Sequence, residues 1–263
     1  AAPCPTALTS VATAMITNCN AEEFQVLRKG DADIVSSLDY EIEAAVRHTL
    51  AEATPNVPVW GEETGKDFEE SERFWVLDPI DGTANFVRGL PLFAVSLAFV
   101  QDGVARVGVI DMPTSRERFW AVEGKGAHCN GKRVHVSLTS EMREAILCFG
   151  DPDVGSEAAV NNRNYNRFLQ KMEASVMKTR VVGSAAVQLA WLAAGRIDIS
   201  VTWGNLPWDV QAGVLLVREA GGIVMDANGE NHRLSSTYTI ASNANLNGFL
   251  DLECPSLSVY QEA

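Results

Sequence analysis

Residues 74–83 read FWVLDPIDGT, and this stretch decides how the rest of the chain is interpreted. It begins with a continuous apolar run, which predicts a buried β-strand. We expect the strand to stop at Asp78 and Pro79, so that the Asp78 carboxylate lies at the edge of a sheet. Asp81 then returns a second carboxylate to the same neighbourhood, and the carbonyl of Ile80 is free to act as a third oxygen ligand. Hard oxygen ligands of this kind suit Mg²⁺, so the stretch indicates a metal site.

Two further segments place carboxylates at the ends of regular elements. Glu62 follows a short predicted strand, and Asp209 opens a predicted helix. Either position alone has an ordinary explanation, since acidic residues are common in turns and in the first turn of a helix. Together with Asp78 and Asp81 they would gather carboxylates around one strand end, where they repel one another unless cations lie between them. Gly82 adds a backbone that can approach a ligand closely.

The pattern of apolar residues predicts two different halves. Helices are predicted at about 8–19, 38–53, 157–172, 185–194 and 208–220, and strands at about 59–60, 74–77, 95–100, 104–110, 118–122, 178–182, 197–201 and 223–225. Asp102-Gly103 between two strands marks a β-hairpin. The first half therefore predicts helices packed on an antiparallel sheet, and the second an α/β layer. We expect one domain over residues 1–263, with lobes at about 1–140 and 141–263.

Composition excludes several classes of protein. The 263 residues carry 21 Lys and Arg against 34 Asp and Glu, a net charge of −13, which argues against a general nucleic-acid binder and against docking on anionic membranes. No apolar stretch reaches the roughly 20 residues that a membrane span requires. The five cysteines form no Cys-x-x-Cys pair, and the four histidines show no zinc spacing. Reduced thiols in a cytoplasmic protein are the expectation.

Several segments together resemble one family. The 74–83 stretch with Asn85-Phe86, residues 208–213 with 219–222, and the segments 61–63 and 183–186 are similar to signatures of the inositol monophosphatase family. The resemblance implies an α/β (α+β) fold, a five-layer αβαβα sandwich with an antiparallel-rich N-terminal sheet and a mixed C-terminal α/β layer. It also implies a Mg²⁺-dependent, lithium-sensitive phosphomonoesterase that acts on a small-molecule phosphate ester, usually as a homodimer.

The resemblance assigns metal ligands position by position. Glu62, Asp78 and the carbonyl of Ile80 match the ligands of the first Mg²⁺. Asp78, Asp81 and Asp209 match those of the second. Glu62 also matches a ligand of a third, weaker ion, which makes two to three ions in all. Two Mg²⁺ would cancel the charge of these carboxylates.

The resemblance also assigns residues to catalysis and to the substrate. Thr83 matches the catalytic threonine and Asp39 its partner, so that Thr83 orients the attacking water or accepts its proton. Glu62 is the third residue expected to take part in catalysis. The amides of Gly82 and Thr83 would face the phosphate. The positions expected to contact substrate are Asp81, Gly82, Thr83, Gly183, Ser184, Ala185 and Thr202.

Substrate choice remains open at the level of sequence. Inositol-specific members of the family carry an acidic residue where this chain has Thr202, so we expect inositol 1-phosphate to be accepted without being the best substrate. A small polyol or sugar phosphate is the leading expectation. The alternatives are histidinol phosphate, a nucleotide 3′-phosphate or fructose bisphosphate on the same scaffold, or a non-catalytic regulatory or binding protein. The presence of every expected metal ligand and of Thr83 argues against the last.

Overall fold

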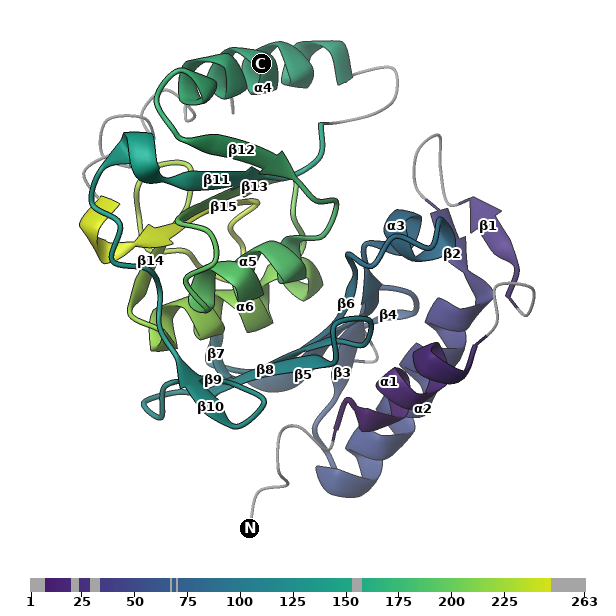
Figure 1. The fold of residues 1–263 in the computed structure, drawn as a ribbon. Coiled ribbons are helices and arrows are strands. Elements are labelled where there is room, and N and C mark those ends of the chain that lie inside the picture. The colour runs from purple at the N-terminus through teal and green to yellow at the C-terminus, as the bar shows by residue number, and fades with distance from the viewer. Residues whose placement is uncertain are drawn as a thin grey trace.

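The computed structural model describes residues 8–19, 24–28, 34–66, 68–69, 71–152 and 158–246, and these form five layers (Figure 1). Helices α1 (Ser10–Asn18) and α2 (Ser37–Ala53) pack against one face of an eight-stranded sheet. Helices α5 (Ala185–Ala193) and α6 (Pro207–Glu219) lie between that sheet and a five-stranded one. Helix α4 (Ala158–Glu173) covers the outer face of the second sheet. The expected αβαβα sandwich is confirmed.

The large sheet is almost wholly antiparallel. Its strand order is β10-β9-β8-β7-β6-β5-β3-β4, and only β3 and β5 run parallel. The bounds are β3 Val59–Gly61, β4 Gly65–Lys66, β5 Arg73–Asp81, β6 Ala94–Gln101, β7 Val104–Met112, β8 Glu117–Val122, β9 Ala127–Cys129 and β10 Lys132–Val134. Asp102 and Gly103 have φ angles of 52° and 73°, as the predicted hairpin turn between β6 and β7 requires. A separate two-stranded sheet pairs β1 (Val26–Arg28) with β2 (Ile34–Ser36).

The sequence prediction that the central strand stops at Asp78 and Pro79 is wrong. Strand β5 continues to Asp81, but its register with β6 shifts, because Asp78 pairs with Ser96 and Asp81 with Ala94. One more residue therefore lies on β5 than on β6 across this interval, which is a β-bulge. A bulge leaves a position without a ladder hydrogen bond, so a proline, which has no N–H, is tolerated there. The short helix α3 (Thr83–Val87) follows directly.

The second sheet is mixed, in the order β12-β11-β13-β15-β14. Its strands are β11 Ile146–Phe149, β12 Lys178–Val181, β13 Ile199–Trp203, β14 Gly222–Met225 and β15 Tyr238–Asn243, with short 3₁₀ turns at Met142–Glu144 and Ala244–Leu246. Strand β11 runs parallel to both β12 and β13, whereas β15 is antiparallel to β13 and β14. The sequence did not predict β11 or β15, and it placed β13 two residues too early.

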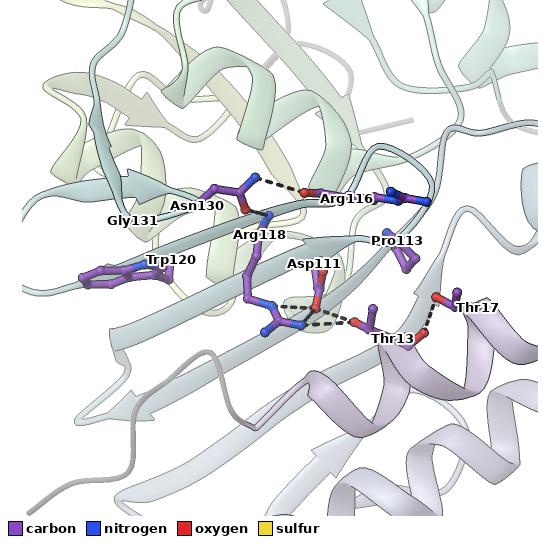
Figure 2. Close-up of a pocket in the computed structure, with 9 residues that line it drawn as sticks. All are labelled: Thr13, Thr17, Asp111, Pro113, Arg116, Arg118, Trp120, Asn130 and Gly131. Atoms are coloured by element: carbon purple, nitrogen blue, oxygen red, sulfur yellow. Dashed lines mark hydrogen bonds and ion pairs between the residues drawn. The ribbon is translucent and has the colours of Figure 1, made fainter.

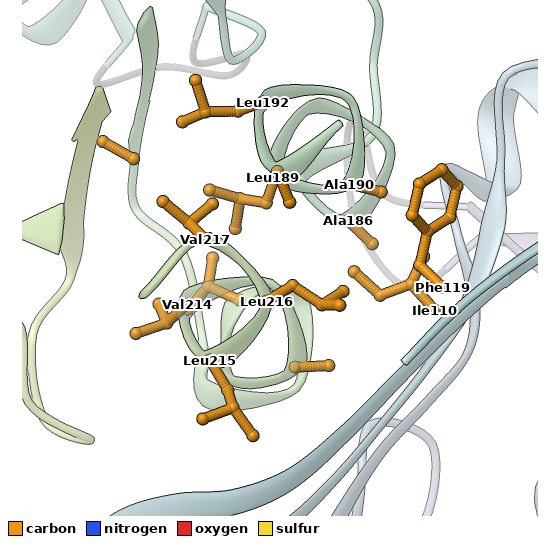
Figure 3. Packing of buried hydrophobic residues seen from close by; sticks show 14 of the residues in the cluster. Ile110, Phe119, Ala186, Leu189, Ala190, Leu192, Val214, Leu215, Leu216 and Val217 are labelled. Carbon is orange, nitrogen blue, oxygen red and sulfur yellow. The ribbon is translucent and has the colours of Figure 1, made fainter. Parts of the chain in front are cut away.

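The core between the two sheets is built from α5 and α6 (Figure 3). Leu189 and Leu216 face each other across the two helices, and Ile110 and Phe119 of the large sheet close the cluster; all four are fully buried. The two helices approach so closely because Gly213 of α6 faces Leu189. A Cβ atom built on Gly213 would lie 2.5 Å from the Leu189 Cβ.

This close approach gives a prediction for stability. Alanine is favoured over glycine in a helix by about 1 kcal/mol, but overpacking a core costs about 1–3 kcal/mol. Gly213→Ala should therefore lower the free energy of unfolding, measured with urea, by about 1 kcal/mol. In a Leu189→Gly background, which removes the Cβ as well as the rest of the Leu189 side chain, the same substitution should raise it, because the clash is gone. Stabilisation by Gly213→Ala in both backgrounds would refute the steric explanation.

Two expectations about the chain as a whole can be compared with the described residues. Within that part of the chain, Cys19, Cys129 and Cys148 form no disulfide bond. Cys4 and Cys254 lie outside the described residues. No helix among the described residues is long and apolar enough to cross a membrane.

Candidate functional site

The predicted metal ligands lie where β5 and the first turn of α6 come together. Asp78 is buried near the end of β5, and burial raises the pKa of its carboxyl well above the ordinary value. The charges of Glu62, Asp81 and Asp209 raise that pKa further, and the Glu62 side chain shares a hydrogen bond with Asp78. The structure therefore brings all four predicted carboxylates into one electrostatic neighbourhood.

The Asp81 carboxylate is held by the start of α5. Its Oδ2 atom accepts a hydrogen bond from Ser184 Oγ at 2.5 Å and another from the amide of Ala186 at 2.6 Å. Burial raises the pKa of Asp81 to about 6, while these hydrogen bonds oppose the rise. The start of α5 thus fixes the Oδ2 atom of the carboxylate, and the Ala185 amide also acts on it. Ser184 also caps α5, because its Oγ accepts the Val187 amide at 3.2 Å.

The fourth carboxylate is set by the geometry of a helix start. Asp209 lies in the first turn of α6, and its Oδ2 atom accepts the amide of Leu206 at 2.6 Å. The residue is half-buried, and burial of its carboxyl among neighbouring groups raises the pKa of that carboxyl. The negative charges of Asp81 and Glu62 raise this pKa further. Pro207 at the helix start needs no hydrogen-bond partner for its nitrogen, which lets the turn form tightly.

Thr83 and Asp39 are joined as the sequence predicts. Thr83 Oγ1 lies 3.2 Å from Asp39 Oδ1 and 2.9 Å from the carbonyl oxygen of Ile80. Asp39 is completely buried in the first turn of α2, where Oδ2 accepts the amide of Ser36 at 2.9 Å and the Ser36 hydroxyl. Burial raises the pKa of Asp39, and its hydrogen bonds counteract part of that rise.

The loop before α3 packs closely against the loop before α5. Gly82 has a φ of 94°, and a Cβ atom there would lie 3.0 Å from the carbonyl oxygen of Gly183. Gly183 has a φ of 69°, so both positions favour glycine. Ala185, the first residue of α5, follows Ser184 on the same edge. The predicted phosphate-facing and alcohol-facing segments are therefore neighbours.

Thr202, an expected substrate contact, is buried in the fold. Thr202 is only 4% exposed on β13, and its hydroxyl donates to Asn205 Oδ1 at 3.1 Å. The same Asn205 oxygen accepts the hydroxyl of Thr239 at 3.0 Å. The single proton of the Thr202 hydroxyl is therefore used inside the fold, to brace the turn that leads into α6.

Sequence reasoning missed two residues whose side chains hold the backbone segments that carry the site. Glu43 is buried on α2, where its carboxylate accepts the amides of Glu63 at 2.9 Å and Thr64 at 3.2 Å and an Arg47 hydrogen bond at 3.0 Å. It thereby fixes the turn that carries Glu62. The available signal was an acidic residue beside the apolar stripe of a helix, with Arg47 one turn later.

The second missed residue, Asn85, ties the two loops together. Its Nδ2 atom lies 2.7 Å from the carbonyl oxygen of Leu92 and 2.7 Å from that of Val182. The Val182 bond joins segments 97 residues apart in the sequence. An asparagine after an Asp-Gly-Thr turn gave no indication of such a distant partner.

The residues at this site fit Mg²⁺ by their chemistry. The donors are carboxylates and one backbone carbonyl, which are the hard oxygen ligands that this ion prefers. Their burial and mutual repulsion make a positive charge favourable there. In the described residues, however, no three acidic, histidine or cysteine side chains already converge as the ligands of one ion. Side chains now engaged in hydrogen bonds with backbone and with one another would have to turn toward the ion.

A cavity of about 500 Å³ lies elsewhere, between α1 and strands β7 and β8 (Figure 2). Arg118 is its central charge, and its Nε atom donates to Asp111 Oδ2 at 2.8 Å. Thr13 donates to the same carboxylate from α1. The cavity contains none of the predicted site residues, and its main ion pair is already satisfied within the fold.

Comparisons with known proteins agree with this architecture. The chain matches the inositol monophosphatase family over residues 4–253. It is 38% identical over 216 residues to the fructose-1,6-bisphosphatase/inositol-1-monophosphatase of Thermotoga maritima, covering 82% of this chain and 80% of that protein. It is 37% identical over 217 residues to the Nus factor SuhB of Escherichia coli, covering 82% and 80%.

Solved structures show the same fold. The suhB protein of Bartonella henselae superposes with a TM-score of 0.88 at 33% identity, covering 96% of each chain. The Thermotoga maritima IMPase superposes with a TM-score of 0.84 at 33% identity, covering 97% of this chain and 96% of that one. Fold and relatives together support one class, phosphatases that act on phosphate esters. Within that class, the chain belongs to the inositol monophosphatase family.

Proposed function

We propose that this protein hydrolyses a small polyol or sugar phosphate monoester with the help of two to three Mg²⁺ ions. The observation that carries the proposal is the buried set of carboxylates around the end of β5, whose charges raise one another's pKa. Glu62, Asp78, Asp81, Asp209 and the carbonyl of Ile80 would hold the ions. Bound Mg²⁺ would lower the pKa of a water molecule and neutralise charge on the phosphoryl and leaving oxygens.

The chain's own residues then orient the reaction. The Thr83 hydroxyl donates toward Asp39 Oδ1 or the Ile80 carbonyl, which leaves its lone pairs to accept a hydrogen bond from the attacking water. If Thr83 takes the proton of that water, Asp39 can receive the Thr83 proton, since burial makes its neutral form accessible. The amides of Gly82 and Thr83 would bind the phosphate. Gly183, Ser184 and Ala185 would face the alcohol.

Metal removal tests the proposal. We expect EDTA to abolish phosphate release from a panel of phosphomonoesters, and Mg²⁺ added in excess to restore it. The control is circular dichroism in EDTA, which should show the fold intact. Full activity in excess EDTA would refute the metal mechanism, and no release from any ester would instead favour a non-catalytic binding protein.

Further properties belong to the same proposal. Histidinol phosphate, a nucleotide 3′-phosphate or fructose bisphosphate could be the substrate on the same scaffold, and the panel separates them. The name of the Thermotoga maritima relative includes fructose-1,6-bisphosphatase, which supports including that ester. We also propose inhibition by lithium, a homodimer, and a cytoplasmic location.

A further inference from the structure

Three parallel strands of the second sheet end at the same edge of that sheet. Strands β12, β11 and β13 lie side by side and run in the same direction. Gly183 follows the end of β12, Asp151 follows the end of β11, and Asn205 follows the end of β13. Ligands of α/β proteins bind at the carboxyl ends of such strands. Asp151 therefore belongs to the same edge as the predicted alcohol-facing segment, although no sequence signature includes it.

The Asp151 carboxylate lies against that segment. A Cβ atom built on Gly183 would be 3.3 Å from Asp151 Oδ2 and 3.0 Å from Asn85 Nδ2. The charge of Asp151 also raises the pKa of Asp81, so the two carboxylates sense each other across the site. Asp151 is consequently close both to the expected alcohol wall and to an expected metal ligand.

The position of Asp151 is fixed by the backbone before it. The amide of Gly150 donates to the carbonyl of Val201 at 2.8 Å, and a Cβ atom on Gly150 would lie 3.4 Å from Thr202 Cγ2. This packing holds the end of β11 against β13, in front of Thr202. Asp151 therefore lies beside the end of β13, close to the buried Thr202.

The Asp151 carboxylate has no partner within the described residues. No hydrogen bond or ion pair joins it to another residue there, and its side chain is exposed to solvent. Its charge acts on the Asp81 carboxylate of the metal site, and partial desolvation raises the pKa of the Asp151 carboxyl. The negative charges of Asp151 and Asp81 repel each other, which is unfavourable without a ligand. A ligand with hydrogen-bond donors would offset that cost, whereas a phosphate group would be repelled.

We propose that Asp151 is a specificity-determining residue, which accepts hydrogen bonds from hydroxyl or ammonium groups on the alcohol part of the substrate. The proposal rests on the phosphatase function proposed above and refines it. It also changes the expectation from Thr202, because a carboxylate contributed by β11 can grip a polyol where β13 offers no free hydroxyl. Charge-assisted hydrogen bonds to such a carboxylate are the strong kind.

Matched pairs of esters test the proposal. myo-Inositol 1-phosphate and cyclohexyl phosphate differ only in the ring hydroxyls, and phosphoethanolamine and ethyl phosphate differ only in the ammonium group. Asp151→Asn and Asp151→Ala should lower kcat/KM about tenfold to a hundredfold for the donor-bearing ester of one pair, and less than about threefold for its donor-free match. The pair that responds identifies a polyol or an amine. Asp102→Asn, an exposed carboxylate at the far end of β6, is the matched control and should change neither pair.

A second readout separates this inference from the proposed function. Calorimetric titration of the same esters in Ca²⁺ measures binding without requiring turnover, and Asp151→Asn should weaken only the donor-bearing ester. Equal losses on both members of each pair would overturn the inference, since Asp151 would then act through charge at the metal site. No change on any ester would also overturn it. If the unmodified protein hydrolyses none of the esters, the proposed function fails, and selective binding through Asp151 is then decided by calorimetry alone.

Discussion

Replacing Asp209 with asparagine is expected to lower kcat/KM for a phosphomonoester by about 10³-fold or more while leaving the fold intact. Metal-assisted charge stabilisation is worth several kcal/mol, and about 1.4 kcal/mol corresponds to a factor of ten in rate. The asparagine side-chain oxygen can still accept the Leu206 amide that caps α6. The substitution removes a negative charge beside Asp81 and Glu62, so the free energy of unfolding without metal should stay the same or rise.

A buried aspartate outside the site supplies the matched control. Asp198 accepts the Ser137 hydroxyl through Oδ1 and the Ile146 amide at 2.7 Å through Oδ2. Asp198→Asn should therefore destabilise the fold and leave the rate per folded molecule nearly unchanged. Steady-state kinetics and urea unfolding on both variants give the comparison. Normal activity in Asp209→Asn would show that Asp209 is not a metal ligand.

Local signals in the sequence predicted the elements that carry the site. The apolar run before Asp78, the Asp102-Gly103 turn and the stripe of α2 each determine their structure within a few residues. The resemblance to a family supplied the order of the five layers, which periodicity alone could not give. Strand β15 escaped prediction because Tyr238–Asn243 mixes polar and apolar residues. Its pairing with β13 and β14 depends on partners far away in the sequence.

Side-chain partners across long separations were the part that the sequence could not provide. Thr202 matched a substrate-facing position, yet its hydroxyl donates a hydrogen bond to Asn205 Oδ1. The same oxygen also accepts a hydrogen bond from the Thr239 hydroxyl. Asp151 matched no signature, yet it lies beside Gly183. Whether a polar residue faces a ligand or the interior depends on which hydrogen bonds the fold completes first, and that is decided by tertiary packing.

Thr83 is the residue whose replacement should separate chemistry from binding. Thr83→Ala removes the hydroxyl held by Asp39 and the Ile80 carbonyl, while the backbone amide that would face the phosphate remains. Groups that orient or deprotonate a nucleophile contribute about 10²–10⁴-fold, so kcat should fall by that order. KM should change little, because the lost interaction is made with the attacking water rather than with the ester.

Two conservative variants determine whether the hydroxyl itself is responsible. Thr83→Ser keeps a hydroxyl within reach of Asp39 and should retain most of kcat, whereas Thr83→Val keeps the shape without the hydroxyl and should behave like Thr83→Ala. Asp39→Asn should lower kcat in the same direction, since an amide cannot accept the Thr83 proton. Near-normal kcat in Thr83→Val would leave Thr83 only the structural role of joining α3 to α2, because shape alone would then account for the wild-type rate.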